Sequence, residues 1–188
     1  MSGAGAIEIR TMTAADASAV LEFARALPAH DLLFLPRDIT HPKVLDAWVN
    51  ELERGTMTSL LAVRDAAVLG CATVVYDPLS WSPHVAELRV VVAAAARGAG
   101  IGRRLMEAGF AAALPLGIEK LIAQMTVDQH AAIATFESMG YRAEALLRDH
   151  VRDRDGTTHD IVILSHRVAD VRARADAYGL GAALADPA

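Results

Sequence analysis

The chain of 188 residues contains a single cysteine, Cys71, and no uncharged run long enough to span a membrane. One cysteine excludes an internal disulfide and suits a reducing compartment. The first ten residues, MSGAGAIEIR, contain neither a basic region nor an apolar core of the kind that signal peptides have. We therefore expect a soluble, cytoplasmic protein without a secretory signal and without a membrane partner.

The chain also has no excess of positive charge, because it contains 18 Lys and Arg residues and 23 Asp and Glu residues. A net charge of −5 gives no support for nucleic-acid binding. No group of His, Cys and Asp residues has the spacing of metal ligands, so we predict no metal site. No internal repeat and no long linker divides the chain, and its length suits one domain with a sizeable core.

The most informative stretch is AELRVVVAAAARGAGIGRRLM, residues 86–106. Residues 88–92 are β-branched and nearly all apolar, which predicts a strand covered on both faces. Glycines then follow at alternate positions, at Gly98, Gly100 and Gly102. Apolar residues recur with helical spacing at Ile101, Leu105, Ala108 and Ala112. Glycines let backbone N–H groups approach one anion, and a helix beginning there points its positive end at it, so this turn is a candidate phosphate site.

Two common phosphate-binding motifs do not fit this turn. A Rossmann fingerprint would need its third glycine at Arg103 or Leu105. A P-loop would need Lys and then Ser or Thr after its last glycine, but Arg103 follows Gly102. The pattern that remains is R-x-x-G-x-G after a valine-rich strand. The structural alternative is an ordinary strand-to-helix turn that happens to be rich in glycine.

Elsewhere the chain shows further strand and helix patterns. We predict strands at residues 7–10, 59–64, 68–76, 118–126, 141–152 and 159–166, and helices between Asp16 and Pro28, at 43–54 and at 128–139. Gly70, inside a predicted strand, indicates a bulge or close packing. The pair Asp155-Gly156 is a strong hairpin signal. Residues 29–42 are irregular and contain aromatic and charged side chains, as functional loops often do.

The R-x-x-G-x-G pattern at residues 97–102 resembles the coenzyme A pyrophosphate loop of the GNAT acetyltransferase superfamily. Residues 129–141, QHAAIATFESMGY, are similar to the family segment N-x-x-A-x-x-x-Y-x-x-x-G-F. The resemblance covers about residues 7–166. It implies a GNAT domain over residues 1–166 and a tail over 167–188 whose composition is compatible with a helix. It also implies an α+β fold with three α/β/α layers, in which a mixed, mostly antiparallel sheet is splayed between two parallel strands and flanked by helices.

The resemblance further implies an acetyl-CoA-dependent N-acetyltransferase in which a small-molecule or peptide primary amine attacks the thioester directly. Acetyl-CoA would be the co-substrate. The coenzyme-binding residues implied in this way are Val90, Val91, Val92, Arg97, Gly98, Ala99, Gly100, Ile101, Gly102, Gln129 and Phe136. Phe136 stands where many members have a tyrosine that protonates the departing thiolate, and phenylalanine has no proton to give. The acceptor amine, the length of the acyl chain and a homodimeric state are left open.

A general base is useful because a protonated amine is not nucleophilic. Glu87 is the first candidate, since some small-molecule members carry Glu at this place, although a salt-bridged carboxylate is the structural alternative. His84 is the runner-up because histidine titrates near physiological pH. Gln124 stands where the ribosomal-protein acetyltransferases of the family have Glu, and its amide cannot act as a base. Cys71 is expected to be a core residue and not a nucleophile. The functional alternative is a non-catalytic acyl-CoA-binding or sensing module, which would release no thiol when amines are added.

Overall fold

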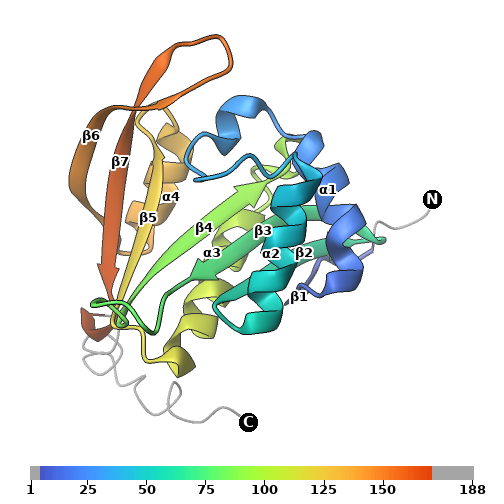
Figure 1. The fold of residues 1–188 in the computed structure, drawn as a ribbon, viewed down its shortest axis with the longest axis horizontal. Helices are drawn as coiled ribbons and strands as arrows, with labels where there is room; N and C mark the ends of the chain where they lie inside the picture. Colours follow the sequence, from blue (N-terminus) through green and yellow to red (C-terminus); the bar gives the residue numbers. More distant parts are fainter. Residues whose placement is uncertain (1–4, 171–188) are drawn as a thin grey trace.

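The computed structural model describes residues 5–170 and contains a mixed sheet of seven strands in the order β1-β2-β3-β4-β5-β7-β6 (Figure 1). The strands are β1 (Glu8–Thr11), β2 (Met57–Arg64), β3 (Ala67–Val75), β4 (Val85–Val92), β5 (Lys120–Thr126), β6 (Arg142–Arg152) and β7 (Thr158–Arg167). The α-helices are α1 (Ala17–Arg25), α2 (Pro42–Arg54), α3 (Ile101–Ala113) and α4 (His130–Ser138). Short 3₁₀ turns are η1 (Ala14–Asp16), η2 (Ala29–Leu32), η3 (Ala94–Ala96) and η4 (Leu114–Leu116).

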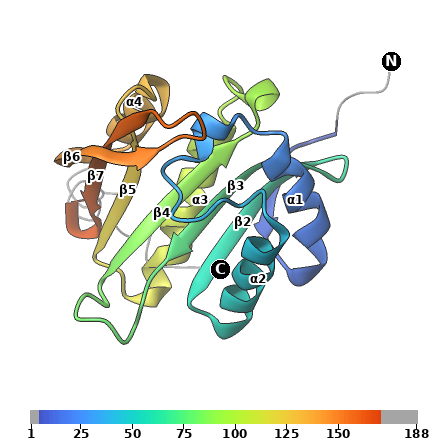
Figure 2. The ribbon, with the colours of Figure 1, turned by 45° about the horizontal axis from the view of Figure 1, so that its top comes forward.

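Helices cover both faces of the sheet, with α1 and α2 on one face and α3 and α4 on the other (Figures 1 and 2). Alternate residues of β4 divide between these layers, as the twofold period of a strand requires. Leu88 packs in the cluster that contains residues of α3 and α4, whereas Val91 packs in the cluster beneath α1 and α2. The result is the predicted three-layer α+β fold.

The approach of α3 to the sheet depends on small residues. A Cβ at Gly70 would lie 2.8 Å from Leu105 Cδ1, and one at Gly109 would lie 2.6 Å from Leu88 Cδ1. The β2–β3 register also shifts between Ala62 and Val63, opposite Gly70. Both sequence-based interpretations of Gly70, a bulge and close packing, are therefore confirmed.

The central feature of the sheet is the separation of β4 from β5. These parallel strands pair only over residues 85–87 and 120–122. Beyond that point β5 continues to pair with β7 on its other side, while β4 pairs only with β3. The edge of β4 at residues 88–92 thus has no strand partner, and the two strands diverge (Figure 2). This confirms the predicted splay.

The predicted elements agree with the structure to within a few residues at their ends. The irregular segment 29–42 contains the turn η2, which the sequence did not indicate. No helix among residues 5–170 is long and apolar enough to cross a membrane. The predicted tail, residues 167–188, begins at the last residue of β7, and residues 171–188 lie outside the described part of the chain.

Candidate active site

A cavity of about 740 Å³ opens where β4 and β5 separate. Every predicted coenzyme-binding residue except Ala99 lines it, namely Val90, Val91, Val92, Arg97, Gly98, Gly100, Ile101, Gly102, Gln129 and Phe136. Residues 90–92 come from the unpaired stretch of β4, the glycines from the turn before α3, and the last two from the start and middle of α4. We call this cavity the coenzyme cleft. The fold therefore brings together two segments about thirty residues apart that the sequence motifs had singled out separately.

The glycine turn in this cleft has the geometry of an anion site. Gly98 and Gly100 adopt left-handed backbone angles, with φ of 76° and 74°, and a Cβ at either position would meet nothing within 4 Å. The first hydrogen bond at the start of α3 runs from Arg104 N to Gly100 O, at 3.1 Å. The preceding N–H groups, those of residues 101–103, have no acceptor within the helix. Open space and N–H groups without an acceptor in the helix therefore lie together at the N-terminus of α3, where the helix dipole is positive.

The turn η2 lies near the diverging ends of β4 and β5 (Figure 2), and its residues His30 and Asp31 line the coenzyme cleft. On the β4 side, Arg97 donates from Nε and Nη2 to Val92 O, both at 3.3 Å, and forms an ion pair with Asp31. On the β5 side, His30 Nε2 lies 2.9 Å from Asp128 Oδ2. A hydrogen bond from the Thr126 hydroxyl, reinforced by His30, lowers the pKa of the Asp128 carboxyl. Through these contacts His30 and Asp31, neighbouring residues of η2, link the β5 side and the β4 side of the cleft.

Phe136 is 5% exposed, and its ring lies edge-on to that of Tyr141 with centroids 5.0 Å apart. The Tyr141 hydroxyl is buried, has no hydrogen-bond partner among the described residues and does not line the cleft. Burial raises the pKa of Tyr141, so the phenol stays protonated at physiological pH. At this position of the cleft wall the chain presents a hydrocarbon ring.

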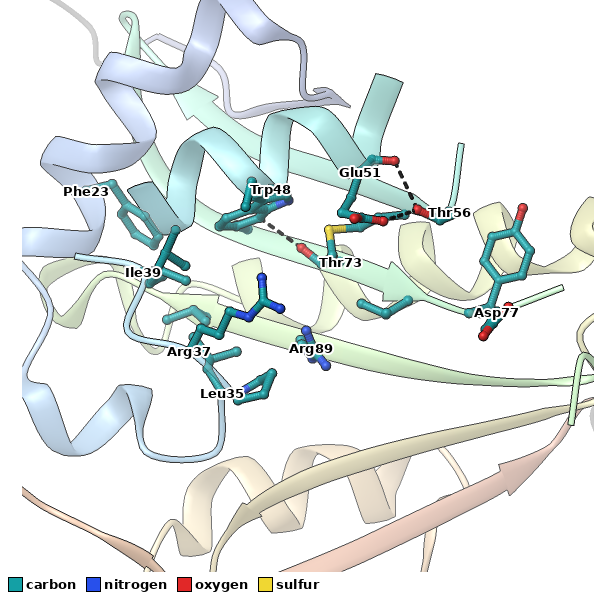
Figure 3. Close-up of a pocket in the computed structure, with 18 residues that line it drawn as sticks. Phe23, Leu35, Arg37, Ile39, Trp48, Glu51, Thr56, Thr73, Asp77 and Arg89 are labelled. Atoms are coloured by element: carbon teal, nitrogen blue, oxygen red, sulfur yellow. Dashed lines mark hydrogen bonds between the residues drawn. The ribbon is translucent and has the colours of Figure 1, made fainter. Parts of the chain in front are cut away.

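A second cavity of about 480 Å³ lies on the other face of the sheet, beneath α1 and α2 (Figure 3). Its walls are mostly apolar and include Phe23, Leu35, Ile39, Val44 and Trp48, with the charged side chains Arg37, Glu51, Asp77 and Arg89. Val91 of β4 lines both this cavity and the coenzyme cleft. Both cavities therefore border the unpaired part of β4 and are neighbours at Val91.

Cys71 forms part of the wall of this second cavity and is buried. Burial raises the pKa of its thiol to about 12, despite the hydrogen bond from the neighbouring Thr73. The thiol stays protonated at physiological pH and is a poor nucleophile. This agrees with the core role expected from the sequence.

The candidate base Glu87 faces the same side of β4 as Arg89 and Val91 but lines neither cavity. Its Oε2 lies 2.6 Å from Arg89 Nη2, and its Oε1 accepts a 3.4 Å hydrogen bond from Gln124 Nε2. Both carboxylate oxygens thus have donors, as the salt-bridge alternative anticipated. The runner-up, His84, is exposed in the loop before β4 and lines neither cavity. Six residues of extended strand, roughly 20 Å, separate it from Val90.

Several residues of the site were missed by sequence reasoning. His30, Asp31, Phe34, Asp128 and His130 line the coenzyme cleft, and Arg37, Trp48 and Arg89 line the second cavity. The contact between Asp31 and Arg97 joins positions 66 residues apart, which one sequence cannot reveal. The only feature of the sequence that pointed to any of these residues was the mixture of aromatic and charged side chains in residues 29–42. Among residues 5–170, no group of three or more His, Cys, Asp or Glu side chains is placed to hold a metal ion.

Comparison with known families matches residues 22–141 to the acetyltransferase (GNAT) family, and the chain belongs to that family. A GNAT-family acetyltransferase from Streptococcus pneumoniae has a TM-score of 0.75 at 17% identity, over 87% of this chain and 100% of that one. A ribosomal-protein-alanine N-acetyltransferase from Brucella melitensis has a TM-score of 0.73 at 25% identity, over 86% and 99%.

A protein from Salmonella typhimurium, solved with its cofactor acetyl-CoA, has a TM-score of 0.74 at 20% identity, over 87% of this chain and 94% of that one. No curated protein sequence matches the chain significantly. The family uses acetyl-CoA and acts on amine acceptors, so the chain is an acyltransferase of the GNAT type, as the sequence resemblance implied.

Proposed function

We propose that the protein transfers the acetyl group of acetyl-CoA to a primary amine by direct attack. The observation that carries this proposal is the unpaired edge of β4, where the coenzyme cleft and the second cavity both border Val91. A thioester held at this edge is within reach of an amine that enters from the second cavity. The experiment that tests the proposal is measurement of free thiol and N-acetylated product after acetyl-CoA is mixed with a panel of amines.

Each part of the coenzyme cleft has a role in this proposal. The N–H groups of residues 101–103 and the Arg97 guanidinium bind the pyrophosphate, which matches the anion geometry of the glycine turn. Free peptide groups of residues 88–92 pair with the amides of the pantetheine arm, as a further strand would. A backbone N–H in this stretch also donates to the thioester oxygen as negative charge develops on it. The side chains of Phe136 and Ile101 exclude water.

The reaction forms a C–N bond between the amine and the acetyl carbonyl carbon and breaks the C–S bond. Glu87 receives the amine proton through a chain of water molecules, because its carboxylate lines neither cavity but contacts Arg89, which lines the second cavity. The departing sulfur takes a proton from water or from the amine itself, since Phe136 has none to give. The protein contributes positioning, electrostatic stabilisation and a route for protons.

Asp31 forms an ion pair with Arg97 in the structure and therefore competes with a bound pyrophosphate for the Arg97 guanidinium. We expect Asp31→Asn to tighten acetyl-CoA binding about three- to tenfold, the range for removing a partly exposed competing charge. Isothermal titration calorimetry measures the change. Asp38→Asn is the matched control, because Asp38 also pairs with an arginine, Arg154 at 2.8 Å, but lines neither cavity. Weaker binding by Asp31→Asn alone would mean that Asp31 orients Arg97 for the coenzyme.

Substitutions at Phe136 distinguish an acetyltransferase from a module that binds acyl-CoA without catalysing a reaction. If the enzyme works without a phenol at this place, Phe136→Tyr keeps turnover within about threefold and leaves its pH profile unchanged. Phe136→Leu weakens coenzyme binding and lowers stability by about 1 kcal/mol, because it loses the edge-on contact with Tyr141. Steady-state kinetics and thermal unfolding measure these effects. Activity that appears only in Phe136→Tyr would instead favour the acyl-CoA-binding module, which the missing hydroxyl supports.

A further inference from the structure

The polar side chains of the second cavity are not evenly distributed. Arg37, from the loop between η2 and α2, and Arg89, from β4, reach into the same part of an otherwise apolar space (Figure 3). Phe23, Ile39 and Trp48 form the wall beside them. The cavity thus combines two guanidinium groups with an apolar surface, close to the point where β4 borders the coenzyme cleft.

Both arginines have donors that the described chain leaves unused. Arg37 is exposed, and its side chain makes no hydrogen bond or ion pair with another residue in the range 5–170. Arg89 pairs with Glu87 through Nη2, but its Nε is buried without a partner. An unpaired buried donor is destabilising unless water or a ligand supplies an acceptor. Arg89 Nη1 also makes no hydrogen bond with another residue in the range 5–170, and because the Arg89 side chain lines the cavity, this group can donate to an acceptor oxygen on a ligand.

The acidic side chains of the cavity are already engaged with neighbouring groups. Glu51 accepts a hydrogen bond from the Thr56 hydroxyl, and Asp77 accepts one from Leu79 N at 2.9 Å. Both lie at the end of the cavity away from Arg37 (Figure 3). The charged side chains of the cavity wall at the other end are Arg37 and Arg89, which favours an anionic group on the ligand there.

We propose that the acceptor is a free α-amino acid with an apolar side chain, whose carboxylate is bound by Arg37 and Arg89. This inference rests on the proposed acetyl transfer and specifies its substrate class. Guanidinium groups bind carboxylates with paired hydrogen bonds, and Nη1 of Arg89, whose side chain lines the cavity, is a free donor for one of them. The apolar wall of Phe23, Ile39 and Trp48 receives the side chain. The amino group, attached to the same carbon as the carboxylate, then faces β4 at Val91, two residues or roughly 7 Å along the strand from Arg89.

A peptide N-terminus fits this cavity less well. Its α-carbon carries an amide in place of the carboxylate, so Arg89 and Arg37 would face a neutral group. The comparison of a free amino acid with its amide tests this difference, because the two share the side chain. Their α-amino groups differ in basicity, so both are measured over a range of pH and the rates are compared per unprotonated amine. L-Leucine, L-methionine and L-phenylalanine, each with its amide, are suitable probes.

The test measures kcat/KM by thiol release for each acid and amide, together with calorimetric binding in the presence of CoA. We expect the wild-type protein to prefer at least one free acid over its amide by about 100-fold, the range for losing charge-assisted hydrogen bonds. Arg37→Gln should lower kcat/KM for that acid about 10- to 100-fold and leave the amide within about twofold. Arg154→Gln is the matched control, because it removes an arginine that contacts the same loop through Asp38 but lines neither cavity.

Failure of this inference is distinguishable from failure of the proposed function. Turnover of amides or of an N-terminal alanyl tripeptide at least as fast as of the free acids would overturn the carboxylate site and leave acetyl transfer intact. Calorimetric binding of the free acid that Arg37→Gln abolishes, with no thiol release from any amine, would support the carboxylate site and overturn acetyl transfer. Equal loss of acid and amide turnover in Arg37→Gln would also overturn the inference, because the arginine would then act on the fold or the coenzyme.

Discussion

Gly100→Val is expected to lower acetyl-CoA affinity about 100-fold. The valine side chain would occupy the open space in which the pyrophosphate meets the N–H groups at the start of α3. Losing two charge-assisted hydrogen bonds at roughly 1.5 kcal/mol each accounts for this factor. The change also places a β-branched residue at a φ of 74°, which costs about 1–2 kcal/mol of folding stability. Calorimetry on the folded variant, checked by circular dichroism, measures the affinity.

Gly117→Val provides a closely matched control for this substitution. Gly117 has the same φ of 74° and the same open surroundings, but it follows η4 and lines neither cavity. The two variants should lose similar stability, while only Gly100→Val loses coenzyme affinity. Equal affinities in the two folded variants would remove the glycine turn from the coenzyme site.

Glu87→Gln is expected to lower turnover near neutral pH by about 10²–10⁴-fold, the usual contribution of a general base. Activity should recover partly as the pH rises past the pKa of the acceptor's amino group, where more of the amine is unprotonated. The glutamine keeps the size of the side chain and an oxygen for Arg89 Nη2. A pH–rate profile of kcat, with rapid-mixing experiments to show that chemistry limits the rate, measures the effect.

The contact between Glu87 and Arg89 gives this experiment a second readout. Unchanged kcat together with a raised KM for carboxylate-bearing acceptors would identify Glu87 as the residue that positions Arg89, and a different group or solvent would then receive the proton. Glu144→Gln is the control, since Glu144 forms a carboxylate–cation pair of the same 2.6 Å length with Lys120 but lines neither cavity. It should leave both kinetic constants unchanged.

The strand, glycine turn and helix that form the proposed coenzyme half of the site were predictable because their sequence requirements are local. Residues 86–106 contain a β-branched apolar run, alternate glycines and apolar residues at helical spacing. Each of these patterns predicts its backbone conformation from neighbouring residues alone. The splay between β4 and β5 came from the resemblance, because strand separation is a tertiary property. The hairpin at Asp155-Gly156 and the bulge at Gly70 were readable for the same local reason as the glycine turn.

The acceptor half of the site was not predictable because its parts meet only in three dimensions. Arg37, Trp48 and Arg89 come from a loop, a helix and a strand, and none has a motif around it. The pairing of Glu87 with Arg89 depends on the alternation of β4 side chains, which places both on one face two residues apart. The sequence permitted both the base and the salt bridge at Glu87, and only the fold shows that its oxygens already have donors.

The central claim is that an amine entering from the second cavity attacks an acetyl thioester held at the free edge of β4. The most direct measurement mixes the protein with acetyl-CoA and a panel of amines that includes free amino acids, and follows thiol release and product mass together. The account predicts amine-dependent thiol release with a matching N-acetylated product. Tight calorimetric binding of acetyl-CoA with no thiol release for any amine would contradict it.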